Sequence, residues 1–140
     1  MKKRHAVIVL LLCGIGTLHA QQTTPKSTSA GVFTEEQAKK GEADYRARCA
    51  SCHGTDLKST DAEAPDLTEE PFKYGWNGKT VGDKFEVIRS TMPPNRGRSL
   101  DDQSYLDIVT YVLRFNKIPS GSQKLEPNID TLKQIVISVP

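Results

Sequence analysis

The sequence predicts an all-α fold, and three observations lead to that prediction. Four stretches begin at a Ser or Thr that can cap a helix, and apolar residues then recur at helical spacing. No segment before the C-terminal tail shows the alternation of polar and apolar residues that is typical of a strand. The length, about 120 residues once an N-terminal signal is set aside, suits one small domain.

The first helix is predicted to run from Thr34 to about Arg48. Thr34 and Gln37 can form a capping box, in which each side chain bonds the backbone N–H of the other. Gly41 and Tyr45 lie four residues apart and therefore share one face of this helix. Because Gly41 has no side chain, we expect another helix to approach closely at this face.

Three more helices are predicted downstream from cap and stop signals, among them a box of Thr80 with Asp83 that begins the second of these helices. Their predicted spans are 68–74, 80–91 and 99–115. The second must end before Met92-Pro93-Pro94, because proline cannot continue a helix. The third, which Ser99 is predicted to cap, is apolar over a broad face, and this indicates that it is largely buried.

The pentapeptide Cys49-Ala50-Ser51-Cys52-His53 follows the first helix and carries the chemistry. Its CxxCH pattern attaches a c-type haem. The two thiols lie about one helical turn apart and can form thioethers to the two vinyl groups of a porphyrin, while His53 can bind the iron. The pattern predicts one haem c, bound covalently through Cys49 and Cys52.

Three other interpretations of the pentapeptide compete with haem attachment, namely a zinc site, a dithiol redox pair and a chance match. A structural zinc needs about four Cys or His ligands. After residue 20, the chain has only His53, Cys49 and Cys52 to offer. A thioredoxin-like dithiol would lie beside a strand–helix–strand pattern, which the sequence lacks. A chance match of five residues stays open.

The N-terminus predicts a signal peptide over residues 1–20. A basic start, Met1–Arg4, precedes an apolar run over 6–18, and Ala20 supplies a small residue at the cleavage site. The run is shorter than the roughly 20 residues that span a bilayer, so we expect a periplasmic protein with no stable membrane span. The signal carries three of the 19 basic residues, which leaves 16 against 17 acidic residues and no argument for nucleic acid binding.

Two segments flank the predicted domain, which covers residues 33–117. Residues 21–32 are rich in Ser, Thr, Pro and Gly without an apolar period, and predict a flexible leader. Residues 118–140 are too apolar for a disordered tail. We expect this C-terminal extension either to pack on the domain, with 135–139 extended, or to dock a partner.

The order of these elements resembles the class I c-type cytochromes over residues 33–117. The resemblance implies a fold in which the N- and C-terminal helices cross around one covalently bound haem, with contacts near Ile108 and Tyr111. It also implies that the carbonyl of Pro65 accepts the ring N–H of His53 and fixes the orientation of that ring.

Met92 is predicted to be the second axial ligand of the iron. It is the only methionine after the signal, it follows a helix, and two prolines restrict its backbone. A thioether raises the reduction potential, and two closed axial positions leave an iron that carries electrons but binds substrate poorly. Trp76 is predicted to contact the haem, either as a propionate hydrogen-bond donor or as an aromatic filler.

These expectations converge on a soluble periplasmic one-electron carrier that is not an enzyme. The chain looks like the small cytochromes that serve periplasmic dehydrogenases, especially quinoprotein types. Its expected partner is therefore a redox protein, a periplasmic dehydrogenase or an oxidase or both. The alternative is a haem enzyme or gas-ligand sensor, such as a peroxidase, which requires a labile distal site.

Overall fold

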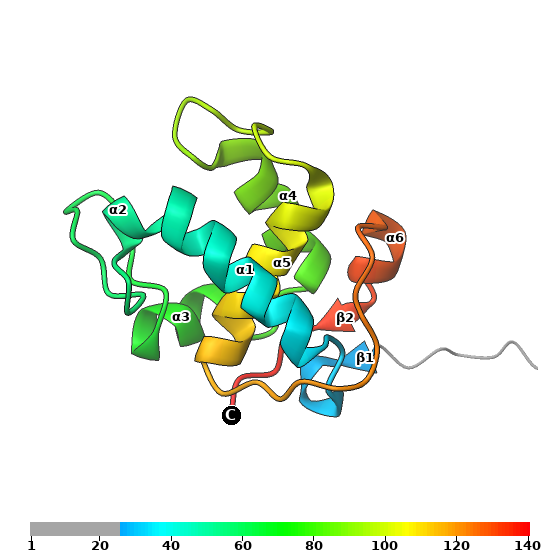
Figure 1. Cartoon of the computed structure of the whole chain (residues 1–140). Coiled ribbons are helices and arrows are strands. Elements are labelled where there is room, and N and C mark those ends of the chain that lie inside the picture. The colour runs from blue at the N-terminus through cyan, green and yellow to red at the C-terminus, as the bar shows by residue number, and fades with distance from the viewer. Residues whose placement is uncertain (1–25) are drawn as a thin grey trace, which may run out of the picture.

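The computed structural model describes residues 26–140 as a set of helices with one short two-stranded sheet, which joins the start of the described chain to its C-terminal segment (Figure 1). The elements are β1 (Lys26–Ser27), the 3-10 helix η1 (Thr28–Ala30), α1 (Glu35–Arg48), α2 (Ala50–His53), α3 (Glu69–Trp76), α4 (Val81–Thr91), α5 (Asp102–Phe115), α6 (Ile129–Leu132) and β2 (Ile135–Val136). The predicted all-α fold class is confirmed. In this part of the chain, no helix is both long and apolar enough to cross a membrane.

The signal predicted over residues 1–20, and residues 21–25 of the predicted leader, lie outside the described residues. Residues 26–32 are described, and they correct the prediction of a flexible leader. Lys26 and Ser27 pair in parallel with Ile135 and Val136, and the side chain of Thr28 is completely buried. This part of the leader is ordered because it pairs with a strand more than 100 residues away. Local composition cannot indicate so distant a partner.

Two predicted capping boxes have different outcomes. The box of Thr80 and Asp83 is complete, with both reciprocal hydrogen bonds present at 3.0 Å. At α1, Thr34 accepts the N–H of Gln37 at 3.1 Å, but the Gln37 side chain turns away from the cap. It donates to the carbonyl of Leu125 and accepts the N–H of the same residue, so it holds the extension instead.

The predicted cap of the last helix is wrong. The side chain of Asp101, two residues after Ser99, accepts the N–H of Ser104 at 2.9 Å. The negative charge of a carboxylate at this position is also stabilised by the positive end of the helix dipole. The N–H of Ser99 instead donates to the hydroxyl of Tyr105 at 3.1 Å, and Ser99 therefore belongs to the preceding loop.

The crossing of α1 and α5 forms the centre of the domain, as Figure 1 shows. A Cβ atom at Gly41 would overlap the backbone carbonyl of Asp107, so only glycine permits this approach. The rings of Tyr45 and Tyr111 lie 5.1 Å apart between centroids. The predicted contact of the two helices near Ile108 and Tyr111 is therefore confirmed, and it fixes the end of α1 that leads into Cys49.

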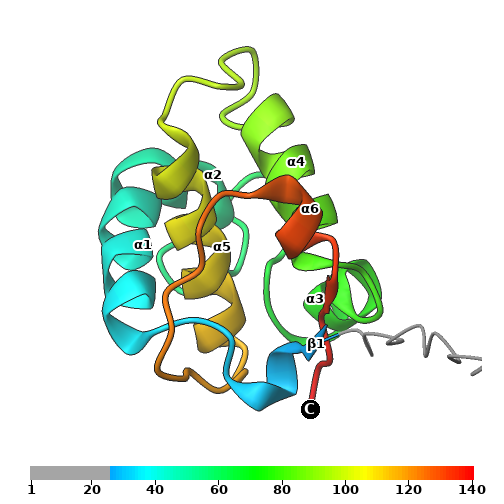
Figure 2. The ribbon, with the colours of Figure 1, turned by 90° about the vertical axis from the view of Figure 1, so that its right-hand side faces the viewer.

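The C-terminal extension, residues 118–140, lies on the domain. Figure 2 shows it running past α5 to α6, which lies against α4. The backbone of Ile137 accepts from Gly78 at 2.9 Å and donates to Lys79 at 2.8 Å. Its buried apolar side chains are those of Ile118, Leu125, Leu132, Ile135 and Ile137. The extension thus supports α4 and the turn before it.

Candidate haem site

A cavity of about 590 Å³ lies among the inner face of α5, α2 with its following loop, and α4 with its following loop. Its volume falls within the roughly 300–1,000 Å³ typical of cofactor and ligand sites. All six residues predicted from the sequence line it: Cys49, Cys52, His53, Pro65, Trp76 and Met92. The structure thus brings together residues that are spread over 44 positions of the chain.

The two cysteines are positioned by the junction of α1 and α2. Cys49 ends α1 and caps α2, and its carbonyl accepts the N–H of His53 at 3.0 Å. Both thiols are half-buried and are not joined in a disulfide. Burial, assisted by Asp44 and Cys52, raises the pKa of the Cys49 thiol to about 11. A dithiol pair needs a lowered pKa in its attacking thiol, and Cys49 does not provide one.

The His53 ring is oriented by a backbone carbonyl. Its Nδ1 atom lies 3.0 Å from the carbonyl oxygen of Pro65, and because a carbonyl can only accept, Nδ1 carries the proton. The lone pair of Nε2 is then left for a metal. The structure thus has the contact that the cytochrome resemblance implied for Pro65.

Tyr45 fixes the backbone beside His53, a role that its helical spacing did not reveal. Its hydroxyl lies 2.8 Å from the carbonyl oxygen of Gly54 and 3.1 Å from that of His53, and it donates to them. Burial raises the pKa of this hydroxyl and keeps it protonated as a donor. The bend between α1 and α2 places this face of α1 over the turn after α2, eight and nine residues further along the chain.

The loop that carries Pro65 is held at several points. The backbone N–H of Ser59 donates to Asp66 at 2.6 Å, and the Asn116 side chain donates to the carbonyl of Leu67 at 2.8 Å. Asn116 comes directly after the predicted helix 99–115, and nothing in that pattern indicates this contact. The bond places the end of α5 in direct contact with the loop, so the Pro65 carbonyl is a fixed acceptor.

Met92 is positioned by the end of α4. It is the C-cap of that helix, its N–H donates to Ile88 at 2.9 Å, and its peptide bond to Pro93 is cis. Its carbonyl accepts the hydroxyl of Tyr105 at 2.8 Å. Tyr105 is buried in α5 and was not a predicted site residue, because nothing in its own apolar pattern distinguishes it from the core.

Trp76 lines the cavity from the end of α3. It is buried and packs on Phe72, with ring centroids 5.1 Å apart. The Nζ atom of Lys84 lies 5.2 Å from the centroid of the Trp76 ring, within the range of a cation–π contact. Lys84 also lines the cavity, and no pattern in the sequence indicates this position.

The residues of the cavity fit a haem c. Two thiols one turn apart, an imidazole with a free Nε2 and a thioether supply the attachment points and the ligand atoms. Most of the remaining lining is apolar and includes Leu67, Val87, Ile88, Ile108 and Val112. Within residues 26–140, no three His, Cys, Asp or Glu side chains gather where they could hold a metal ion by themselves.

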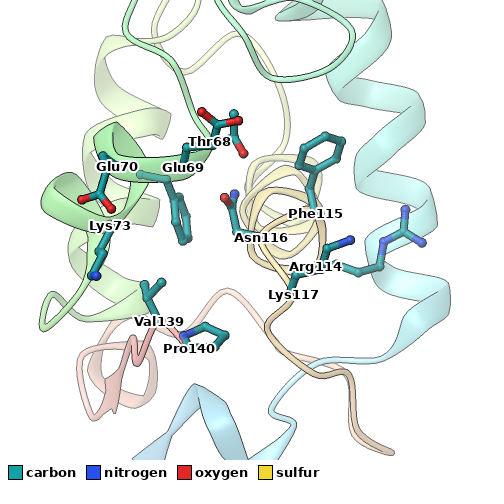
Figure 3. Close-up of a pocket in the computed structure, with 11 residues that line it drawn as sticks. Thr68, Glu69, Glu70, Lys73, Arg114, Phe115, Asn116, Lys117, Val139 and Pro140 are labelled. Carbon is teal, nitrogen blue, oxygen red and sulfur yellow. The ribbon is translucent and has the colours of Figure 1, made fainter.

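A second cavity, of about 660 Å³, lies where α3 meets the end of α5 and the C-terminus (Figure 3). Acidic and basic side chains share its lining, among them Glu69, Glu70 and Lys73. The guanidinium of Arg114 points towards α1, where it pairs with Glu35 and Glu42. No Cys, His or Met side chain lines this cavity, so it offers none of the ligand atoms found in the first.

One family model, described as cytochrome C oxidase, cbb3-type, subunit III, matches residues 36–112. The match covers more than half of the chain. It spans α1 to α5 and includes every residue that lines the first cavity. No curated protein and no solved structure matches the chain.

Proposed function

The chain belongs to the family of cytochrome C oxidase, cbb3-type, subunit III, and on that premise we propose that it is a soluble periplasmic one-electron carrier with a His53/Met92-ligated haem. The prediction of a c-type cytochrome with covalently bound haem c is confirmed by the family match. Haem c, when bound, supplies an iron that gains and loses one electron. The chain is thus a haem c electron-transfer protein, and the ligand pair, compartment and partners are our proposal.

One observation carries the ligand assignment: His53 and Met92, from two separate elements, line the same cavity. His53 offers Nε2, because Nδ1 donates to Pro65. Met92 is the only methionine after residue 20. A nitrogen and a thioether together close both axial positions, which favours electron transfer over substrate binding.

The lining near Met92 also favours a carrier over a haem enzyme. Besides Met92, α4 and its following loop contribute Lys84, Val87, Ile88, Thr91, Pro93, Pro94 and Arg96 to the lining. The part nearest Met92 in the chain, from Val87 to Arg96, contains no His, Asp or Glu, whereas peroxidase-like chemistry requires a positioned acid or base. This part of the cavity therefore suits a coordinated thioether.

Carbon monoxide binding tests the proposal. The reduced wild-type protein should bind CO slowly or not at all, because Met92 occupies the distal position. A Met92→Ala variant, as the matched control, should bind CO rapidly. Rapid, saturable binding by the wild type would contradict the carrier and favour the haem enzyme or gas sensor.

The proposed periplasmic location rests on the predicted N-terminal signal and has its own test. Protein isolated from the periplasmic fraction should begin at Gln21, as intact mass would show. A protein retained in the cytoplasm with residues 1–20 still present would contradict the location.

The proposed partners are a periplasmic dehydrogenase as donor and an oxidase or other redox protein as acceptor. The family description names an oxidase subunit, which fits an oxidase as one partner. Of the arginines near Met92, Arg89 is paired with Asp102 at 2.6 Å, whereas Arg96 and Arg98 are exposed. These two could attract an acidic partner, and capture from the periplasm followed by reduction kinetics would identify it.

A further inference from the structure

We propose that Lys84, held over the ring of Trp76, is the subsite that binds the carboxylates of the haem and raises its reduction potential. The inference deepens the proposed function and rests on it, since the cavity must hold haem c. It adds a residue that neither the CxxCH pattern nor the family match identifies.

Lys84 is unusual among the charged side chains of the cavity. The other Lys, Arg, Asp and Glu residues of the lining are Arg48, Asp61, Glu63 and Arg96, and all four are exposed. Lys84 is half-buried, and its ammonium lies 5.2 Å from the centroid of the Trp76 ring. Since Trp76 is itself fixed against Phe72, the ammonium is held at the cavity wall.

No carboxylate within residues 26–140 pairs with Lys84, since none lies within 4.0 Å of its amine, and the charge of Asp83 acts on it only from farther away. The adjacent Asp83 accepts the N–H of Thr80 and completes its capping box. Burial, and secondly the like charge of Lys79, lower the pKa of Lys84. A half-buried cation without a partner is unfavourable, so the site favours an incoming anion.

The haem supplies that anion. Its two carboxylates and its two vinyl groups are on different edges of the macrocycle, and Cys49 and Cys52 anchor the vinyl edge at α2. The carboxylate edge must then face other elements of the cavity. Lys84 on α4 and Trp76 on α3 provide a cation and an aromatic ring there, and a charge-assisted contact would fix the orientation of the haem.

Pairing with Lys84 has a consequence for the potential. Reduction adds one negative charge to the haem, and an unneutralised carboxylate close to it opposes that change. An ammonium in contact with the carboxylate removes this opposition and so raises the potential. Because the pair is partly buried, added salt should screen it only weakly.

Spectroelectrochemical titration of the holoprotein at low and high salt tests the proposal. Lys84→Met should lower the midpoint potential at both salt concentrations, and Lys84→Arg should keep it near the wild-type value. Lys79→Met is the matched control, because Lys79 is exposed, lies close enough to act on Lys84 and does not line the cavity. It should shift the potential at low salt only.

Resonance Raman spectra give a second readout, since the propionate bending band should shift in Lys84→Met and not in Lys79→Met. Equal shifts in potential for both lysine variants, or an unchanged potential in haem-loaded Lys84→Met, would overturn the proposal. If Lys84→Met does not accumulate with haem, Lys84→Gln against Lys84→Arg provides the same comparison. Absence of a sulfur–iron band in the wild type would instead contradict the Met92 ligation and leave the lysine comparison intact.

Discussion

The two walls of the haem cavity are held in different ways. The His53 wall consists of the lining residues from 45 to 67, and the Met92 wall consists of those from 84 to 96. In the His53 wall, separate hydrogen bonds fix the ring of His53, the turn at Gly54 and the loop at Leu67. Each of these bonds comes from a different part of the chain, so the wall does not depend on any single one.

The Met92 wall is held in its helix more than in its loop. Ion pairs from Arg89 to Asp102 and from Glu86 to Lys133 support α4. In the loop after α4, over residues 92–96, a single side-chain hydrogen bond, from Tyr105 to the Met92 carbonyl, reaches α5. This loop is otherwise closed on itself, through bonds from Arg96 to Pro93 at 2.8 Å and from Arg98 to Arg89 at 2.7 Å. A loop with few anchors is the part of the cavity that is easiest to displace.

The helices next to the two walls also differ in how tightly they are packed. The His53 wall follows α1, which Gly41 locks against the backbone of α5. The Met92 wall follows α4, where Gly82 lies close to Lys133 of the extension. We infer that the covalent attachment side is rigid, and that the distal ligand decides whether the protein is a closed carrier or an open haem enzyme.

Removing both thiols should produce the largest effect, because it abolishes the chemistry of the His53 wall. A Cys49→Ala/Cys52→Ala variant should retain no covalent haem, as haem staining after denaturing electrophoresis would show. Ser51→Ala, which keeps both thiols, should stain like the wild type. Persistent staining of the double variant would contradict attachment at these residues.

Gly41→Ala should be the most destabilising of the glycine changes, because it disrupts the close contact of α1 with α5 next to the His53 wall. A methyl group would overlap the Asp107 carbonyl between two rigid helices, so we expect a loss of about 3 kcal/mol in the free energy of unfolding. Denaturant unfolding measures it. Gly75→Ala in α3 is the control, because a Cβ there meets nothing within 4 Å, and it should gain up to about 1 kcal/mol.

Gly82→Ala applies the same change behind the Met92 wall and should cost less, about 2 kcal/mol. A Cβ would lie 2.7 Å from the Lys133 side chain and 2.8 Å from its backbone nitrogen. The side chain can move, and the extension can shift with it. A larger loss than that of Gly41→Ala in the same unfolding experiment would show that the extension is as rigid as α5.

Tyr105→Phe should have a smaller effect on stability, about 1 kcal/mol for the lost hydroxyl, but a specific effect on the Met92 wall. Without the bond to the Met92 carbonyl, external imidazole should displace Met92 more readily, which a ligand titration measures. Tyr111→Phe, another buried tyrosine of α5, should leave imidazole binding unchanged. Equal imidazole affinity in both variants would remove the assigned role of Tyr105.

Local signals in the sequence predicted most of the fold and the residues that line the first cavity together. The Thr80 box, the stop at Met92 and the CxxCH pattern all depend on residues within a few positions of one another. Gln37 shows what local signals cannot predict. Its side chain bonds the backbone of Leu125, 88 residues away, instead of completing the capping box with Thr34. Lys84 and the ordered residues 26–32 were missed for the same reason, since their partners are set only by the tertiary fold.

The near-infrared spectrum of the ferric protein tests the central claim most directly, namely that Met92 completes the coordination begun by His53. The wild type should show a sulfur–iron charge-transfer band, and Met92→Ala should lack it while keeping its covalent haem. Absence of the band from the correctly loaded wild type would contradict Met92 ligation, and with it the account of a closed electron carrier.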